Sequence, residues 1–553
     1  MGDLIGNHLL SLVVFVPLAG AALLLFFPES QAKAAKWFAL SVSVVEFALS
    51  IPLWTRFAIA GAGFQFSERM AWIPSLGISY SVGIDGISLV LILLTTLLTP
   101  VSLLFSVTHV EKSVRAFSIA FLVLETGMIG SLAALDLALF YVFWEVMLVP
   151  MYFIIGIWGG ARRIYAAMKF FLFTMAGSLL MFLAILYLAV RHRASTGEWS
   201  FLLADLTRLD LPASTQALLF FAFALAFAIK VPVFPLHTWL PDAHTEAPTA
   251  GSIILAGVLL KLGVYGYLRF ALPLFPDAAM HYAPWLGVLG VIGVIYGAMV
   301  AYAQKDMKRL VAYSSVSHLG LVVIGIGAFT ATALSGSILQ MINHGLSTGA
   351  LFLLVGVLYE RRHTREISAY GGIAGIVPVT TALFVIATLS SIGLPGLNGF
   401  VGEFLILVGT WTSPHRWWSV AAATGVILSA VYMLSLVQRV FWNPLVHQEN
   451  RSIPEIRRSE LFAASVLVVL MVWIGVRPND VLSRLEPSVE AVRASVAQSS
   501  ARVRAPRAVS AGWGGRVPAR DNGMQATTGG GRPQGPALRH EIRPQAHAQK
   551  AAR

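Results

Sequence analysis

The chain has 553 residues, of which 57% are hydrophobic and only 12% are charged, whereas ordinary soluble domains carry roughly a quarter charged residues. A mean hydropathy of +0.75 over this length excludes a soluble protein with a polar surface, so lipid must solvate much of the chain. The net charge of +12 is not accompanied by a basic stretch interleaved with aromatic residues, so we expect no nucleic-acid partner.

Cofactor chemistry is not expected in this chain. It contains no cysteine, which iron–sulfur clusters require and structural zinc sites usually use. It also lacks a GxxxxGK phosphate loop and a GxGxxG turn placed between a strand and a helix. We therefore expect no metal and no cofactor here, and any electron transfer that the chain serves must occur on another chain.

Stretches of about twenty apolar residues predict roughly fourteen membrane-spanning helices, so the fold class is an all-α polytopic membrane protein. The first stretch has no basic segment before it and no Ala-x-Ala cleavage site, which favours a retained span over a signal peptide. The predicted spans are 8–27, 34–54, 85–107, 116–135, 137–158, 164–190, 215–244, 248–272, 283–303, 309–328, 332–358, 374–410, 416–440 and 459–476.

The loops between these spans differ in positive charge. If the N-terminus lies outside, the inner loops carry about seventeen Lys and Arg residues and the outer loops about seven, Arg269 among the latter. This bias predicts a bilayer protein with both termini outside. Abundant Ala, Arg and Gly without a targeting peptide favour a bacterial chain, and thus the bacterial inner membrane.

Two predicted spans are interrupted by Pro and Gly. One contains Pro232 and Pro235, and the other contains the run GLPGLNG around Pro395. Broken helices in corresponding positions of two repeats are typical of transport sites. Each break falls in the fourth helix of a five-helix block, which predicts two inverted repeats; two unrelated proline kinks are the alternative. The predicted organisation is helices 1–3 in 1–115, repeats in 116–272 and 273–440, a last helix in 441–478, and a basic tail in 479–553, disordered except for a short helix at most.

Charged side chains inside the predicted spans are the candidate functional residues, because each costs at least about 2.5–3.5 kcal/mol to insert. Glu145 lies in the middle of span 137–158, and Lys230 lies just before the break of span 215–244. A carboxylate and an ammonium group on neighbouring helices can modulate each other's pKa and act as a switchable proton donor and acceptor. A static ion pair between helices is the alternative. Lys261 lies in mid-span without a partner nearby in the sequence, which favours proton exchange over snorkelling to the surface.

Two histidines and two further glutamates complete this set. His318 lies among three serines and His344 beside Asn343, and histidine titrates near physiological pH while hydroxyl groups can order water. Packing histidines are the alternative for both. Glu403 follows the second break and is expected to be the carboxylate on the exit side. Glu125 is a weaker candidate for the intake side.

Other polar residues have simpler explanations. Asp136 and Asp306 precede predicted helices, so N-capping is expected. A further group follows the break of span 215–244, where helix termination and loop hydrogen bonding are favoured over metal ligation. This group consists of His237, Asp242, His244 and Glu246.

Five long motifs, in order, resemble the M-type antiporter-like subunits of bacterial respiratory NADH:quinone oxidoreductase (complex I). The resemblance covers roughly residues 1–478. No long lateral helix followed by a final span is evident, which resemblance to the distal sister subunit would require. The motifs are LFYVFWEVMLVPMYFIIGIWGG, AFAIKVPVFPLHTWLPDAHTEAPTAGSIILAGVLLKLGVYG, KRLVAYSSVSHLG, NHGLSTGALFLLVGVLYERRHTR and GLPGLNGFVGEF.

The resemblance implies fourteen helices, two inverted repeats and one proton channel driven by redox chemistry elsewhere. It implies that Glu145 and Lys230 form the coupling pair, that Lys261 and His318 relay protons centrally, and that Glu403 closes the path. It also implies partners: other membrane-arm subunits, especially two sister antiporter-like subunits, with FMN and iron–sulfur clusters in separate subunits. A subunit of a multisubunit sodium/proton antiporter is one alternative, and a scaffold whose charges only join helices is another.

Overall fold

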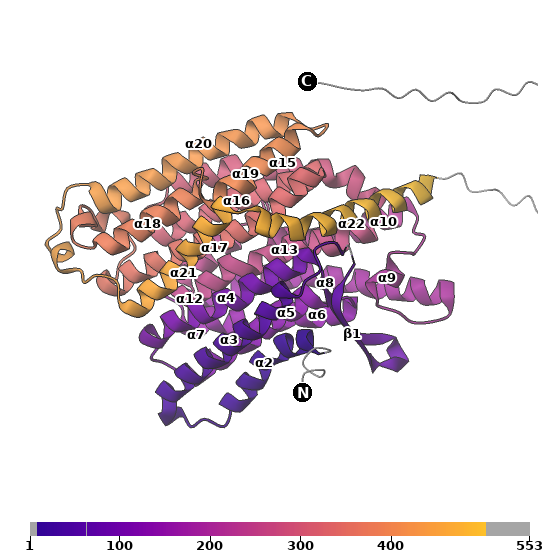
Figure 1. The fold of residues 1–553 in the computed structure, drawn as a ribbon, viewed down its shortest axis with the longest axis horizontal. Helices are drawn as coiled ribbons and strands as arrows, with labels where there is room; N and C mark the ends of the chain where they lie inside the picture. Colours follow the sequence, from indigo (N-terminus) through magenta and orange to yellow (C-terminus); the bar gives the residue numbers. More distant parts are fainter. Residues whose placement is uncertain (1–7, 62, 505–553) are drawn as a thin grey trace, which may run out of the picture. The chain divides into compact units, whose positions relative to one another are not determined.

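The computed structural model describes residues 8–61 and 63–504, which form a bundle of long helices with one β-hairpin (Figure 1). The α-helices are α2 (Leu9–Leu24), α3 (Ala32–Thr55), α4 (Gly86–His109), α5 (Val114–Ala133), α6 (Leu137–Val146), α7 (Leu148–Trp158), α8 (Arg163–Thr196), α9 (Leu203–Leu206), α10 (Ala213–Lys230), α11 (Trp239–Glu246), α12 (Thr249–Ile254), α13 (Leu260–Gly266), α14 (Leu272–Leu274), α15 (Pro276–Tyr302), α16 (Met307–Ala328), α17 (Ala331–Arg362), α18 (Pro378–Ser391), α19 (Asn398–Trp411), α20 (Trp417–Val437), α21 (Arg458–Val476) and α22 (Asn479–Arg504). Turns of π-helix are η3 (Leu255–Leu259), η4 (Tyr267–Ala271) and η7 (Gln438–Trp442), and 3-10 turns are η1 (Glu29–Gln31), η2 (Pro74–Leu76), η5 (Ile367–Ala369), η6 (Ile373–Gly375) and η8 (Gln448–Ser452).

Helices occupy all of the segments that hydropathy predicts to span the membrane. Among the described residues, twelve helices are long and apolar enough to cross a bilayer. The two remaining segments are α2, which has 16 residues, and the interrupted pair α18 and α19, with 14 residues each. The predicted all-α membrane class is therefore confirmed, whereas the count of fourteen spans and the inverted repeats stay predictions.

Both predicted breaks are present. The first separates α10 from α11, and Trp239 compensates for part of it by donating its indole N–H to the carbonyl of Ile229 at 2.9 Å. The second separates α18 from α19, where Gly393 and Gly396 adopt positive φ angles of +74° and +94° that favour glycine. At the first break residues 231–233 are buried, so protein groups can satisfy the freed backbone. At the second break Leu394 is 42% exposed and nothing packs within 4 Å of a Cβ on Gly396.

A β-hairpin that the sequence patterns did not predict lies between α3 and α4. Strands β1 (Gln65–Ile73) and β2 (Ile78–Ile84) pair antiparallel across Gly77, whose φ is +66°. A search for long apolar stretches cannot find such short alternating strands. We call the end of the bundle that carries β1 and β2 the hairpin end.

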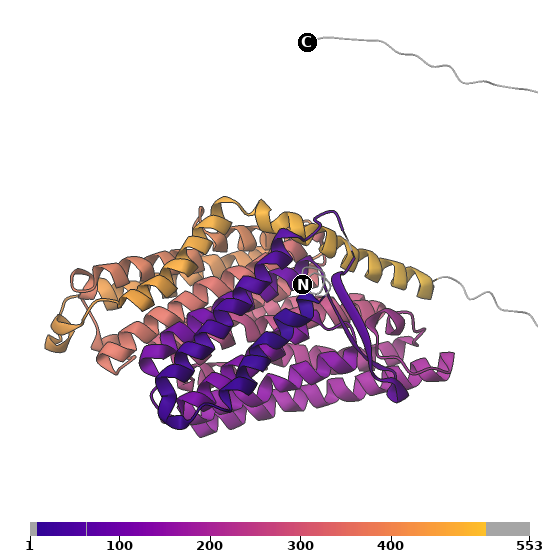
Figure 2. The same cartoon turned by 60° about the horizontal axis from the view of Figure 1, so that its bottom comes forward.

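The segment after α21 differs from the predicted tail. It continues as α22, a helix of 26 residues that reaches the hairpin end (Figures 1 and 2, yellow). The hydroxyl of Ser488 on this helix accepts from the backbone N–H of Gly86 at 2.9 Å. Its buried residues Val481, Leu485 and Val489 follow helical spacing, a pattern that a composition-based expectation of disorder overlooked. The remainder of the predicted disordered tail, 505–553, lies outside the described residues.

The middle of the bundle is protein-enclosed. Helices α16 and α17 and the segment from α12 to α14 are almost wholly buried by other helices, whereas fewer than half of the residues in the apolar parts of α8, α20 and α21 are buried. The exposed faces carry large apolar side chains such as Leu172, Leu183 and Ile427, as a lipid-facing surface requires. The enclosed helices are those that carry the central charged candidates.

Candidate proton path

Four titratable side chains form what we call the central row. The Nζ atom of Lys261 on α13 lies 2.7 Å from Nδ1 of His344 on α17. The ring centroids of His344 and His318, the latter on α16, are 5.8 Å apart. Nδ1 of His318 lies 3.4 Å from Oε1 of Glu403 on α19. All four residues are buried, so the row runs through the protein interior from one predicted repeat into the other.

Lys261 has partners that its sequence neighbourhood did not indicate. Its helix, α13, is flanked by the π-helical turns η3 and η4, and such turns are frequent at functional sites. The ammonium donates to the carbonyl of Ala256 in η3 and faces the ring of His344, 83 residues away in the chain. His344, the weaker of the two histidine candidates, is therefore the residue that links Lys261 to His318.

The two ring nitrogens of His318 face different partners. Since Nδ1 faces the Glu403 carboxylate, we assign its proton there, which leaves Nε2 to accept. Nε2 lies 3.2 Å from the hydroxyl of Tyr432 and 3.4 Å from that of Ser391. The sequence analysis missed both hydroxyl residues, because neither carries a charge that would mark it within an apolar span.

The break between α18 and α19 shapes the surroundings of Glu403. The amide of Gln340 donates to Oε1 of Glu403 at 3.3 Å. A Cβ atom on Gly393 would lie 2.5 Å from Oε2 of Glu403, so any larger residue there would displace this carboxylate. Asn343, beside His344, donates to the carbonyl of Asn398 at 2.7 Å and fixes the start of α19.

Glu145 and Lys230 are near each other but do not form an ion pair in the described structure. The ammonium of Lys230 lies 5.2 Å from the ring centroid of Trp144 and 5.8 Å from that of Phe170, so aromatic faces surround it. Glu145 is half-buried, its Oε1 lacks a hydrogen-bond partner, and its charge acts on Lys230 from beyond contact distance. The arrangement differs from the static ion pair that the sequence left open as an alternative.

Glu125 lies apart from the central row and pairs with Glu46 of α3. Both carboxyl groups are fully buried and act on each other electrostatically, and none of their four oxygens has a hydrogen-bond partner among the described residues. Two ionised carboxylates in this interior would repel each other, so the pair is costly unless a proton or an opposite charge accompanies it. The sequence analysis overlooked Glu46, although a carboxylate in the middle of span 34–54 is the same signal that identified Glu125.

Polar residues near the ends of the bundle have mostly structural roles. Asp136 accepts from the backbone N–H groups of Ala138 and Leu139, and Asp306 caps α16 in the same way, which confirms both predicted N-caps. After the first break, Asp242 binds Lys169 at 2.8 Å, and Glu246 accepts from the backbone of Arg162 at 2.9 Å.

His244 has a different environment from its neighbours. Its ring is fully buried, stacks on Phe352 at 4.7 Å, and has no hydrogen-bond partner at either nitrogen in the described structure. It lies within electrostatic range of Lys308 and Lys261. Lys308 donates to the carbonyl of Ala247 and lines a cavity of about 460 Å³ at the end of the bundle opposite the hairpin. His244 thus lies between this cavity and the central row.

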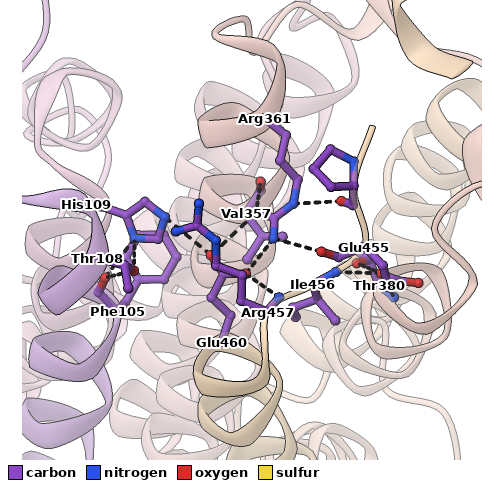
Figure 3. Close-up of polar contacts among 11 residues, drawn as sticks. Phe105, Thr108, His109, Val357, Arg361, Thr380, Glu455, Ile456, Arg457 and Glu460 are labelled. Atoms are coloured by element: carbon purple, nitrogen blue, oxygen red, sulfur yellow. Dashed lines mark hydrogen bonds and ion pairs between the residues drawn. The ribbon is translucent and has the colours of Figure 1, made fainter. Parts of the chain in front are cut away.

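One side of the same cavity is braced by a buried cluster of charges (Figure 3). Glu460 of α21 binds Arg361 of α17 at 2.6 Å and His109 of α4 at 3.3 Å. Arg361 also donates to the carbonyl of Pro454 at 2.9 Å, and neighbouring Glu455 accepts from the hydroxyl of Thr380 at 2.5 Å. The cluster ties four helices (α4, α17, α18 and α21) and one loop together at this end.

Comparisons with known proteins match this architecture. The family model described as the transmembrane region of NADH:quinone oxidoreductase and Mrp antiporters matches residues 134–429. The NADH-quinone oxidoreductase subunit M of Rhodobacter capsulatus is 46% identical over 87% of this chain and 96% of its own length. A chain of respiratory complex I from Thermus thermophilus superposes with a TM-score of 0.80 at 35% identity, covering 88% of this chain and 99% of that one. A chain of the Mrp complex from Dietzia sp. has a TM-score of 0.77 at 20% identity, a likeness of fold alone.

Proposed function

The chain belongs to the NADH:quinone oxidoreductase/Mrp antiporter membrane family and is a proton-translocating membrane subunit of an NADH:quinone oxidoreductase, and from this premise we propose that its protons travel along the central row. The observation that carries the proposal is the contact of Lys261 with His344, which extends through His318 to Glu403. Proton transfer needs donors and acceptors at hydrogen-bond distance or separated by one water molecule. The step from His344 to His318 requires a bridging water, and the 3.4 Å between Nδ1 of His318 and Oε1 of Glu403 must shorten slightly for direct transfer.

Protons reach Lys261 from the cavity opposite the hairpin end. Lys308 lines this cavity, and His244 lies between Lys308 and Lys261. Neutral histidine can accept at one nitrogen and donate from the other, so His244 can pass a proton inward. Glu125 and Glu46 lie apart from this route, so the intake role of Glu125 stays a prediction.

The Glu145–Lys230 pair drives the row. A charge or conformational signal from a neighbouring subunit alters the separation of the two side chains and thereby the proton affinity of Lys230. Lys230 ends α10, which contacts α13 closely, since a Cβ atom on Gly263 would lie 2.7 Å from the carbonyl oxygen of Phe227. A change of charge at Lys230 therefore acts on Lys261 across one helix contact.

The surroundings of the chain follow from the same premise. We place it in a bacterial inner membrane, with the hairpin end and both termini outside, because the predicted inner loops carry the excess of Lys and Arg. Its partners are other membrane-arm subunits, including two sister antiporter-like subunits. FMN and iron–sulfur clusters belong to partner subunits, since this chain has no cysteine to ligate a cluster.

The test uses membrane vesicles carrying Glu145→Gln, with Glu198→Gln on the exposed surface as the matched control. NADH:quinone reductase activity and proton uptake are recorded together after assembly is checked on a native gel. An assembled E145Q complex in which both signals fall supports a redox-driven pump, because a stalled pump holds back electron transfer. Two normal signals contradict the coupling role, a loss of assembly alone supports the scaffold alternative, and NADH-independent sodium/proton exchange supports the antiporter alternative.

A further inference from the structure

A second series of polar side chains leads from Lys261 toward the hairpin end, away from the central row. Tyr265 and Arg269 follow at intervals of four residues, which places them along one side of the same helix. Nε of Arg269 donates to the hydroxyl of Tyr265 at 3.1 Å, and Nη2 lies 2.6 Å from Oδ1 of Asp85 on the N-terminal side of α4. The positive-inside count placed Arg269 in an outer loop; the structure corrects this, since only 5% of the residue is exposed.

The hydrogen bonds and the fixed charge of Arg269 in this series oppose proton transfer. The hydroxyl proton of Tyr265 is donated to the carbonyl of Leu132 at 2.8 Å, and the hydroxyl oxygen accepts from Arg269. A guanidinium group has five donors and no acceptor, and it stays charged at all accessible pH values. Beyond Tyr265 the next acceptor is the Ser88 hydroxyl, 3.3 Å away, which itself accepts from Arg269 at 3.4 Å. A proton that reached Tyr265 from Lys261 would therefore meet the fixed positive charge of Arg269 at either hydroxyl.

A cavity lies beyond Asp85 and Arg269, at the hairpin end. It has a volume of about 370 Å³ and is lined by Asp85, Arg269 and Arg69 together with residues of α22 such as Ser488. The guanidinium of Arg269 stacks on the ring of Phe64 at 4.8 Å, which holds it against the hairpin. Asp85 and Arg269 therefore lie between this cavity at the hairpin end and the side chains of Tyr265 and Lys261.

We propose that Arg269, positioned by its ion pair with Asp85, is an electrostatic seal that prevents protons on Lys261 from leaving toward the hairpin end through the first repeat. Pores exclude protons with a fixed arginine in the same physical way. The seal directs protons from Lys261 to His344, so this inference rests on the proposed function. A simple tie between α4 and η4 is the competing explanation, because buried ion pairs are weak evidence for a role.

The experiment measures two quantities on the purified complex in proteoliposomes. The first is passive proton leak under an imposed pH gradient without NADH, and the second is proton uptake per NADH oxidised. Arg269→Gln removes the charge, Arg269→Lys keeps it, and Arg69→Gln removes an exposed charge from the same cavity. We expect R269Q to raise the passive proton leak several-fold and to lower proton uptake per NADH. R269K and R69Q should show the same leak as the unaltered complex. A leak in R269Q equal to that of the unaltered complex overturns the seal.

Two further variants separate a seal from a tie. Asp85→Asn breaks the ion pair but leaves the arginine charge, so the seal predicts little leak, whereas a tie predicts that D85N and R269Q behave alike. If R269Q fails to assemble, the charge-free double variant D85N/R269Q avoids an unpaired buried carboxylate and must still leak. A double variant whose passive proton leak equals that of the unaltered complex overturns the proposal.

The origin of the leak is tested by adding Lys261→Met to R269Q. If the seal closes off Lys261, K261M suppresses the leak, and a leak that persists contradicts the proposal. Pumping by K261M alone tests the central row, and this readout is independent of the leak. Failure of the seal and failure of the proposed function thus give different results.

Discussion

Replacing His344 by Leu removes the only described link between Lys261 and His318. In the structure the Nζ to Nδ1 distance of 2.7 Å is within the range for direct proton transfer, whereas His318 is a further ring away, at a centroid separation of 5.8 Å from His344. Leucine fills most of the space without a titratable atom, so a single water cannot easily replace the imidazole.

The magnitude follows from the role of one positioned proton carrier. Such groups contribute about 10²–10⁴-fold to rate, or roughly 3–5 kcal/mol of barrier. Proton flux through this subunit should fall by at least about a hundredfold in H344L. The remaining uptake by the complex should then come from its other subunits.

The assay records proton uptake and NADH oxidation in vesicles, normalised to the amount of assembled complex. His281→Leu is the matched control, because His281 is exposed on α15 and does not contact the central row. If the assembled H344L complex takes up as many protons per NADH as the H281L control, protons do not need the imidazole of His344, and its place in the central row is wrong.

Three further predictions concern the supports of the path. Gly393→Ala should displace the Glu403 carboxylate, because its Cβ would lie 2.5 Å from Oε2, and should lower proton uptake several-fold. Gly396→Ala is the control, because its φ of +94° brings the same backbone strain while nothing lies within 4 Å of the added Cβ. The Gly396→Ala complex should therefore take up more protons than the Gly393→Ala complex. Glu460→Ala leaves Arg361 buried without its carboxylate and should cost about 3–5 kcal/mol, seen as less complex surviving a heating step, while Glu460→Gln should lose less; equal survival of both variants would count against the cluster. At Glu455, burial alone would raise the pKa of the carboxyl, but hydrogen bonds from Thr380, Ile456 and Val379 outweigh it and hold that pKa below its ordinary value. The stability this adds is present above about pH 4.3 and is lost as pH falls through the lowered pKa, so thermal unfolding should separate the unaltered protein from Glu455→Gln near neutrality and no longer in acid.

The sequence predicted well whatever depends on local composition. Apolar stretches located the helices, Pro and Gly located both breaks, and the capping preference of aspartate located Asp136 and Asp306 at helix starts. These features depend on neighbours within one or two helical turns, so they can be derived without knowing the fold.

Contacts between distant segments could not be predicted in the same way. His344 meets Lys261 across 83 residues, and Glu46 meets Glu125 across two helices, so only packing reveals which buried charges are partners. Arg269 was misplaced because a charge near a span end looks like a loop residue until Asp85 is known to face it. The hairpin and α22 were missed because their alternating or amphipathic patterns contribute little to mean hydropathy.

The most direct test of the central claim is the number of protons taken up per NADH oxidised by an assembled complex carrying Lys261→Met. Lys33→Met, at an exposed position of α3, is the control. We predict that K261M loses the share of uptake that passes through this subunit while K33M keeps it. An assembled K261M complex with undiminished uptake would contradict the claim that protons travel along the row from Lys261 to Glu403.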